Sequence, residues 1–247
     1  MTPADPFRHH PELRDKLNAA DQSVFRDLDL AQMDARLTAA GMAADWRTPS
    51  AEREAGRRGF LDGHWNQDLW VFAYGSLMWD PSVDFVEVRK ARCDGFSRSF
   101  CLWDEGGRGS TENPGLMLAI DQGGVCDGLA FRLSAGQLDH ETFVLFRREM
   151  IAPAYRPAWL PLTTDHGPVT ALAFVADRRQ DKIRPGIPLD RQARMIATAT
   201  GMLGSSFDYL AGIERQLRVL GVEDPYVTRL FDAVQRLRAG DMPARDR

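Results

Sequence analysis

The sequence has no long apolar run and no excess of positive charge, and each of these shortages excludes a class of protein. The longest apolar runs fall far short of the roughly twenty residues that a membrane-spanning helix needs. The polar start with His9 and His10 does not resemble a secretory signal. A net charge of −4 gives no general attraction to nucleic acid or to an anionic membrane. We therefore expect a cytoplasmic protein with neither nucleic acid nor membrane as a partner.

Cysteine and histidine are too few and too scattered to predict a disulfide framework or a metal centre. Cys93, Cys101 and Cys126 are an odd number without paired spacing, which favours reduced thiols in a reducing compartment. The five histidines show no zinc-ligand spacing, and no strand leads into the glycine motif of a phosphate or dinucleotide site. We therefore expect neither a metal nor a cofactor.

Residues 1–64 differ from the rest of the chain in their charge and in the spacing of their apolar residues. Apolar residues at loosely helical spacing predict one or two amphipathic helices between Pro11 and Leu37. The charged stretch Thr48–Arg58 is broken by Pro49 and Gly56, which predicts a linker or a mobile loop. The 247 residues, 44% of them hydrophobic, suffice for a sizeable core. We expect a helical extension and linker over residues 1–64 and a main domain over residues 65–240.

Short apolar segments separated by turn residues predict a series of strands from residue 69 onward. Gly123-Gly124 lies between two of these segments and predicts a hairpin turn. Such closely spaced strands indicate a small sheet or barrel. Of three closing helices, the second is capped by Ser205 or Ser206 and the third begins at Asp224 and Pro225. The strands are expected at 69–74, 83–92, 95–103, 115–121, 125–133, 155–162 and 168–176, and the closing helices at 189–203, 206–220 and 225–238.

The first strand runs straight into a glycine turn with the sequence Tyr74-Gly75-Ser76-Leu77-Met78-Trp79. Because glycine lacks a Cβ, a ligand can approach the backbone closely at such a turn. Main-chain amides there can hold a carboxylate or stabilise an oxyanion. An ordinary turn after a buried strand has the same local sequence.

A helix with a carboxylate at its end follows the strands. Ser134 and Gln137 predict a capping box at the start of a helix that runs to about residue 150. Glu149 continues the apolar face of this helix. Burial and the negative end of the helix dipole both disfavour an ionised carboxylate, so a raised pKa would suit Glu149 to proton transfer. The same position also suits a carboxylate that extends into solvent or pairs with Arg147 or Arg148.

The stretch Gly106–Gly115 is too long for a tight turn and too polar for a core. We expect an exposed loop beside the binding site. Its length and polarity suit a lid over a bound ligand, with Glu112 and Asn113 in the part that would close. A loop without any role in binding would have the same composition.

Four landmarks, in this order, resemble those of the ChaC-like γ-glutamylcyclotransferases, which act on glutathione. They are residues 74–77 after a strand, the loop Arg108–Gly115, Arg148-Glu149 with Tyr155 following, and the stretch Ile196–Gly201. Together they cover roughly residues 69–238. The resemblance implies an α+β fold, a small mixed β-barrel flanked by helices. It also implies that Glu149 is the catalytic acid/base and that Tyr74–Trp79, with Tyr155, bind the γ-glutamyl group.

The resemblance also implies a reaction and a small-molecule substrate, glutathione or another γ-glutamyl compound. The free α-amine of the γ-glutamyl group attacks its own γ-carbonyl, which forms 5-oxoproline and releases cysteinylglycine when the substrate is glutathione. The sequence departs from the family pattern at Ser110-Thr111, Leu116 and Asp181–Gly186. A non-catalytic γ-glutamyl or amino-acid binding module on the same fold, and hydrolysis at the same site, are the alternatives. The sequence does not indicate an oligomeric state.

Overall fold

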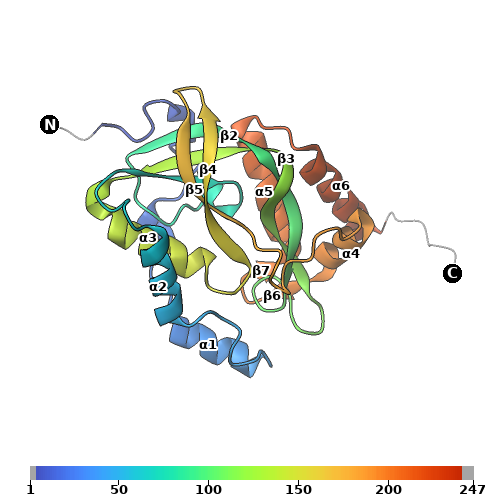
Figure 1. The fold of residues 1–247 in the computed structure, drawn as a ribbon. Coiled ribbons are helices and arrows are strands. Elements are labelled where there is room, and N and C mark those ends of the chain that lie inside the picture. The colour runs from blue at the N-terminus through green and yellow to red at the C-terminus, as the bar shows by residue number, and fades with distance from the viewer. Residues whose placement is uncertain (1–3, 241–247) are drawn as a thin grey trace.

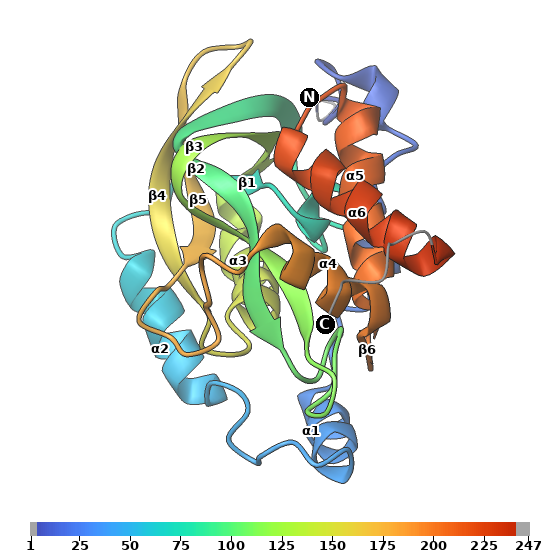
Figure 2. The same ribbon diagram turned by 90° about the vertical axis from the view of Figure 1, so that its right-hand side faces the viewer.

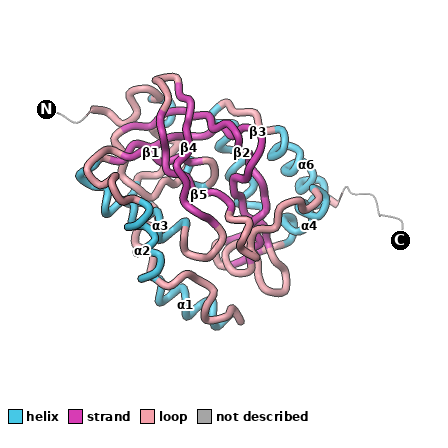
Figure 3. The backbone as a smooth tube through the Cα atoms, in the orientation of Figure 1, coloured by secondary structure: helices cyan, strands magenta, loops and turns pink. Residues whose placement is uncertain are grey.

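A closed barrel of five strands forms the centre of the computed structural model, which describes residues 4–240 (Figures 1 and 3). The order around the barrel is β1-β3-β2-β4-β5. β5 returns to β1 and pairs with it in parallel, whereas the other neighbours are antiparallel. The mixed barrel predicted from the family resemblance is confirmed. The strands are β1 (Leu69–Ala73), β2 (Glu87–Asp104), β3 (Gly115–Leu133), β4 (Tyr155–Thr164) and β5 (Val169–Ala176).

β2 and β3 are each one long strand where the sequence predicted two short ones. Their antiparallel pairing continues through a register shift at Gly95. Gly95, Gly123 and Gly124 have φ angles of 83°, 107° and 72°, in the region that favours glycine. A bulge of this kind bends a strand pair without ending it. The predicted hairpin turn at Gly123-Gly124 is therefore wrong, because both strands bend together and remain paired.

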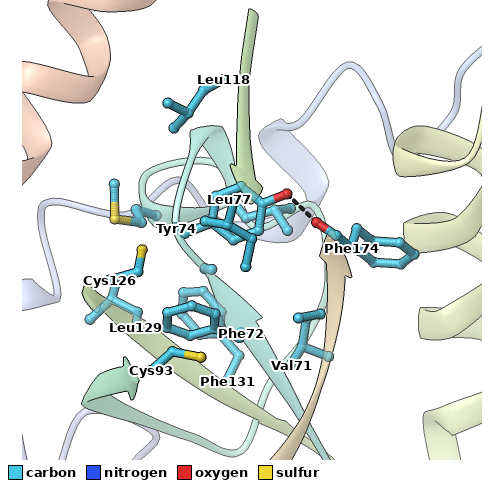
Figure 4. Packing of buried hydrophobic residues seen from close by; sticks show 14 of the residues in the cluster. Val71, Phe72, Tyr74, Leu77, Cys93, Leu118, Cys126, Leu129, Phe131 and Phe174 are labelled. Atoms are coloured by element: carbon cyan, nitrogen blue, oxygen red, sulfur yellow. Dashed lines mark hydrogen bonds between the residues drawn. The ribbon is translucent and has the colours of Figure 1, made fainter. Parts of the chain in front are cut away.

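Apolar side chains from the strands fill the barrel, and one tyrosine links the end of β1 to the neighbouring strand β5 (Figure 4). Phe72 and Phe131 are both buried in this core. The Tyr74 hydroxyl, at the end of β1, donates a hydrogen bond to the backbone carbonyl of Phe174 on β5. This bond fixes the start of the glycine turn relative to the strand that closes the barrel.

Three helices cover one side of the barrel, next to β3 (Figure 2). They are α4 (Leu189–Thr198), α5 (Ser206–Leu220) and α6 (Pro225–Ala239). The predicted caps are confirmed, since Ser205 accepts a hydrogen bond from the Asp208 amide and Asp224 accepts from the first amides of α6. α4 ends before the predicted residue 203 because the chain turns into a small hairpin, β6 (Thr200–Gly201) with β7 (Gly204–Ser205).

On the other side lies α3 (Leu138–Glu149), the helix that carries the predicted catalytic carboxylate. The predicted capping box at its start does not form. Ser134 precedes a 3₁₀ turn, Ala135–Gln137, and its side chain makes no capping bond to a backbone amide. α3 itself starts at Leu138, and its buried face includes Thr142 as the spacing predicted.

The N-terminal part contains two helices, α1 (Leu30–Ala39) at the edge of the molecule and α2 (Ser50–Phe60) beside α3. The linker predicted at Thr48–Arg58 is wrong, because most of it is α2, which packs on α3. Arg57 accounts for the difference, since its guanidinium donates to Asp139 Oδ1 and to Thr142 Oγ1, both at 2.7 Å. Two 3₁₀ turns, at 11–13 and 20–22, precede α1. No helix among residues 4–240 is long and apolar enough to cross a membrane.

Candidate active site

A cavity of about 260 Å³ lies where the glycine turn, the end of α3 and the start of the 105–114 loop meet. Tyr74, Gly75, Ser76, Leu77 and Trp79 line it, as the sequence predicted for a binding turn. Met78 does not: its side chain is fully buried, and its backbone carbonyl accepts a hydrogen bond from Gln216 at 2.8 Å. Met78 therefore supports the turn from behind rather than forming part of the wall.

The glycine turn ends in a short 3₁₀ helix at Ser76–Met78. Within it the amides of Met78, Trp79 and Asp80 donate to carbonyls of the turn itself. The first amides of a helical turn have no acceptor inside that turn. The amides of residues 75–77 are thus the ones suited to an anionic group of a ligand.

Two tyrosines of the cavity wall have their hydroxyls fixed by backbone carbonyls. Tyr155, at the start of β4, donates to the Leu118 carbonyl at 2.8 Å, and Tyr74 donates to Phe174 as described above. Burial raises the pKa of both phenols well above the ordinary value. Both hydroxyls therefore stay protonated, and the two rings form a rigid wall.

Glu149 lies in the cavity wall at the C-terminal end of α3, with its side chain 14% exposed. Burial raises its pKa above the ordinary value, and the nearby charge of Asp80 acts in the same direction while Arg148 opposes it. The Arg148 Nε lies 3.1 Å from Glu149 Oε1. The carboxylate thus both pairs with Arg148 and faces the cavity, so the two possibilities considered from the sequence are compatible.

Arg148 joins the carboxylate to the glycine turn. Its guanidinium donates to Ser76 Oγ at 2.8 Å, to the Asp80 carbonyl at 2.6 Å and to Ser82 Oγ. Ser82 is fully buried and has a φ of 61°, which a non-glycine residue seldom adopts. The sequence indicated Arg148 only as a partner of Glu149, because nothing local shows that residues 76–82 fold back onto the end of α3.

The loop after β2 contributes only its first part to the cavity. Gly106, Gly107 and Arg108 line the wall. Glu112 and Asn113, the proposed lid residues, are exposed and lie outside that wall, and Asn113 contacts Thr198 across 3.4 Å. Closure of this part of the loop over a ligand stays a prediction.

Arg108 is a candidate ligand residue that the sequence reasoning missed. Its guanidinium stands over the Tyr209 ring, 5.5 Å from the centroid, and burial lowers its pKa. Its Nε is buried and has no hydrogen-bond partner among residues 4–240. A guanidinium with a free donor is suited to bind a carboxylate. The available signal was an arginine that starts the glycine-containing landmark loop.

The outer side of the cavity is formed by the N-terminal part, where the sequence indicated no site residues. The N-terminal side chains that line the cavity are apolar and scattered in a charged stretch, a pattern that is typical of an ordinary amphipathic helix. They are Phe25, Leu28, Met33, Leu37, Met42 and Trp46, which we call the outer wall.

The cavity offers acids, cations and backbone amides, but the described residues contain no group of His, Cys, Asp and Glu suited to hold a metal ion. The three cysteines are buried and unpaired. The arrangement can therefore bind an anionic molecule at the amides and guanidinium groups and exchange a proton at Glu149.

Comparisons of the sequence with known proteins indicate the family to which the chain belongs. A family model described as a ChaC-like protein matches residues 69–237. The glutathione-specific gamma-glutamylcyclotransferase of Escherichia coli (strain K12) is 38% identical over 176 residues, 71% of this chain and 76% of that protein. The glutathione-specific gamma-glutamylcyclotransferase 1 of Mus musculus is 29% identical over 178 residues, 69% of this chain and 80% of that protein.

A solved structure supports the same assignment at the level of fold. The crystal structure of a yeast γ-glutamyl cyclotransferase specific to glutathione superimposes with a TM-score of 0.64 and 18% identity. The match covers 71% of this chain and 99% of the yeast chain. With the family match over the barrel and the closing helices, the chain belongs to the ChaC-like family.

Proposed function

We propose that the protein is a γ-glutamylcyclotransferase that cleaves glutathione into 5-oxoproline and cysteinylglycine. One observation carries the proposal: Glu149 and the glycine turn line one cavity, and Arg148 forms an ion pair with Glu149 and donates a hydrogen bond to Ser76 of the turn. The curated relatives carry glutathione-specific cyclotransferase names, which supports the choice of substrate. Three unpaired cysteines support a cytoplasmic location.

The reaction requires that the substrate adopts a conformation in which its amine reaches its own γ-carbonyl, and that one proton is transferred. The α-amine of the γ-glutamyl group attacks the γ-carbonyl carbon, and a new C–N bond closes the five-membered ring. The bond between that carbon and the nitrogen of cysteinylglycine then breaks. Well-oriented intramolecular attack contributes up to about 7 to 11 kcal/mol to lowering the barrier. Every atom comes from the substrate, so the chemistry needs no cofactor.

Glu149 supplies the proton transfer in this proposal. Its carboxylate accepts a proton from the attacking amine and returns it to the departing amide nitrogen. The pKa raised by burial makes the carboxylate a better base than an exposed glutamate. Arg148 is a positioning residue, because it holds Glu149 and Ser76 in one geometry without itself exchanging a proton.

The anionic parts of the substrate have separate ligands. The backbone amides of residues 75–77 hold the developing oxyanion or the α-carboxylate. Arg108 provides a guanidinium for a substrate carboxylate, since its Nε is without a partner in the described chain. Tyr74 and Tyr155 contribute shape, because both hydroxyls are already bound to backbone carbonyls.

Product analysis tests the proposal. Incubation of the purified protein with glutathione should release 5-oxoproline and cysteinylglycine in equal amounts. Free glutamate in place of 5-oxoproline would mean that the site hydrolyses its substrate. Saturable glutathione binding without either product would make the protein a binding module.

A further inference from the structure

The outer wall belongs to a segment that lies before the family match. Residues 23–46 precede residue 69, where the ChaC-like match begins. Six of their side chains nevertheless line the same cavity as Glu149. Part of the cavity surface is thus supplied by a segment outside the matched family domain.

Two anchors hold this segment over the cavity. At the first, Ser23 Oγ lies 2.6 Å from Ser82 Oγ, and Arg26 makes two hydrogen bonds of 2.9 Å to the buried carboxylate of Glu141. At the second, the Thr48 amide donates to the Ile151 carbonyl at 2.9 Å, directly before α2. The chain between the anchors must therefore pass across the mouth of the cavity.

The apolar side chains between the anchors face the cavity rather than the core. Met33 and Leu37 are only 8% and 5% exposed, yet neither belongs to the hydrophobic clusters that fill the described fold. Figure 1 shows their helix, α1, at the edge of the molecule beyond α2. Across the mouth they meet the 105–114 loop, where a Cβ on Gly106 would lie 3.0 Å from Leu37 Cδ2 and would overlap Met42 Cε.

We infer that the outer wall determines specificity by binding the central side chain of a γ-glutamyl tripeptide through apolar contact. The inference rests on the proposed function, which leaves the outer end of the cavity for the departing dipeptide. The wall offers methyl, thioether and aromatic surface, and its one indole N–H, on Trp46, is already donated to Asp34 Oδ1 at 3.0 Å. A hydroxyl placed there would lose its water without gaining a partner, which is unfavourable. A thiol or an alkyl group binds water only weakly, so its transfer to the wall costs little free energy.

The probes are three tripeptides that differ only in the central side chain. Glutathione carries a CH2SH group, γ-glutamyl-2-aminobutyrylglycine carries an ethyl group, and γ-glutamylserylglycine carries a CH2OH group. We expect the protein to use the first two with kcat/KM values within a fewfold of each other and to use the seryl compound about tenfold less well. The thiol would then be recognised as an apolar group.

The double variant Met33→Ser/Leu37→Ser removes the apolar face of α1. We expect the preference for glutathione over the seryl compound to fall from about tenfold to about twofold, because hydroxyls on the wall can now bind the substrate hydroxyl. Met42→Ser, in the loop after α1, is a second variant in case the first disturbs the helix. Val24→Ser is the matched control, since Val24 belongs to the same segment but is 73% exposed and outside the wall.

Each outcome is decisive when kcat/KM ratios and Tm are measured together. A reduced preference in both wall variants, with Val24→Ser unchanged, supports the inference. An unchanged ratio overturns it, and so does an equal loss for all three tripeptides with a lower Tm, because the segment would then act only as structural support. No discrimination by the original protein also overturns it. Absence of 5-oxoproline from every tripeptide would instead refute the proposed function itself.

Discussion

The two ends of the cavity are built on different principles. At the inner end, within the family domain, Arg148 forms an ion pair with Glu149 and a hydrogen bond to Ser76. At the outer end, the apolar side chains belong to a segment with polar anchors before residue 28 and after residue 46. The difference indicates that the reaction and the choice of leaving group are carried by separable parts of the chain.

The separation has an energetic basis. Arg148 is buried, and removing a hydroxyl that accepts its hydrogen bonds, on Ser76 or Ser82, would leave a polar group without compensation in a low-dielectric site. The outer wall makes mostly dispersion contacts with the cavity, which are non-directional and tolerate exchange of side chains. Substitutions should therefore lower stability more at the inner end of the cavity than at the outer end.

The strongest test of the inner end is Glu149→Gln. The amide keeps the size of the side chain but cannot accept and return a proton, so kcat should fall by about 10² to 10⁴. Because the substrate carboxylates are bound elsewhere, the Kd of glutathione should change by less than about tenfold. Stopped-time assays of 5-oxoproline and isothermal titration with glutathione measure the two effects.

The control for this variant is Glu112→Gln, which changes an exposed carboxylate outside the cavity wall. It should leave turnover unchanged, and loss of activity there with retention in Glu149→Gln would mean that the wrong carboxylate was assigned. Stability gives an independent check. Since burial holds the folded pKa of Glu149 above 4.5, this group lowers stability as pH rises from 4.5 through its folded pKa. The glutamine variant should thus be at least as stable at neutral pH.

A smaller effect is expected at α2, which directly follows the second anchor of residues 23–46, here called the outer segment. Arg57 is 1% exposed and joins α2 to α3, so Arg57→Met should lower the free energy of unfolding by about 1 to 3 kcal/mol. Looser anchoring should raise KM for glutathione more than it lowers kcat. Arg58→Met is the matched control, because Arg57 and Arg58 both pair with Glu54 and Asp139. Arg58 is 53% exposed, so its loss should cost less than about 1 kcal/mol.

Urea unfolding and steady-state kinetics on both variants decide the point. If Arg57→Met lowers kcat with KM unchanged, the outer segment is coupled to the chemistry, and the two ends are not separable. Equal destabilisation by both variants would mean that burial of Arg57 contributes nothing specific.

The smallest expected effect is a shift in pH dependence at the inner end. The charge of Asp80 raises the pKa of Glu149, so Asp80→Asn should lower it. Activity that needs the ionised Glu149 falls at acid pH, and this limb of the kcat/KM profile should move to lower pH in the variant. Asp84→Asn is the control, since Asp84 is 54% exposed and pairs with Arg26. A limb that stays in place or moves upward would argue against Glu149 as the titrating group.

Local signals in the sequence predicted the features that depend on local structure. Asp224 followed by Pro225 marks the start of α6 because capping involves only neighbouring amides. Helical spacing predicts that Glu149 continues the apolar face of α3, and the side chain is 14% exposed with a pKa raised by burial. Its catalytic role stays a prediction until the glutamine variant is measured.

Three features that the sequence did not predict depend on distant residues. Gly123-Gly124 has the composition of a hairpin turn, but pairing with β2 keeps the strand continuous. Thr48–Arg58 has the composition of a linker, but Arg57 forms a hydrogen bond with Asp139, far along the chain, and this contact holds the segment on α3. The outer wall could not be recognised for the same reason, since nothing in residues 23–46 shows that they pass over a cavity formed by later residues.

Closure of the barrel has a consequence for the protein during its synthesis. Tyr74 borders the glycine turn, but the carbonyl that orients its hydroxyl belongs to Phe174, 100 residues later. The parallel pairing of β1 with β5 also waits for these last residues of the barrel. Chains are made from the N-terminus at about 5 to 20 residues per second, so the glycine turn emerges seconds before its support. A nascent or truncated copy would therefore lack a finished site, and only a chain that has completed its barrel could act on the γ-glutamyl compounds around it.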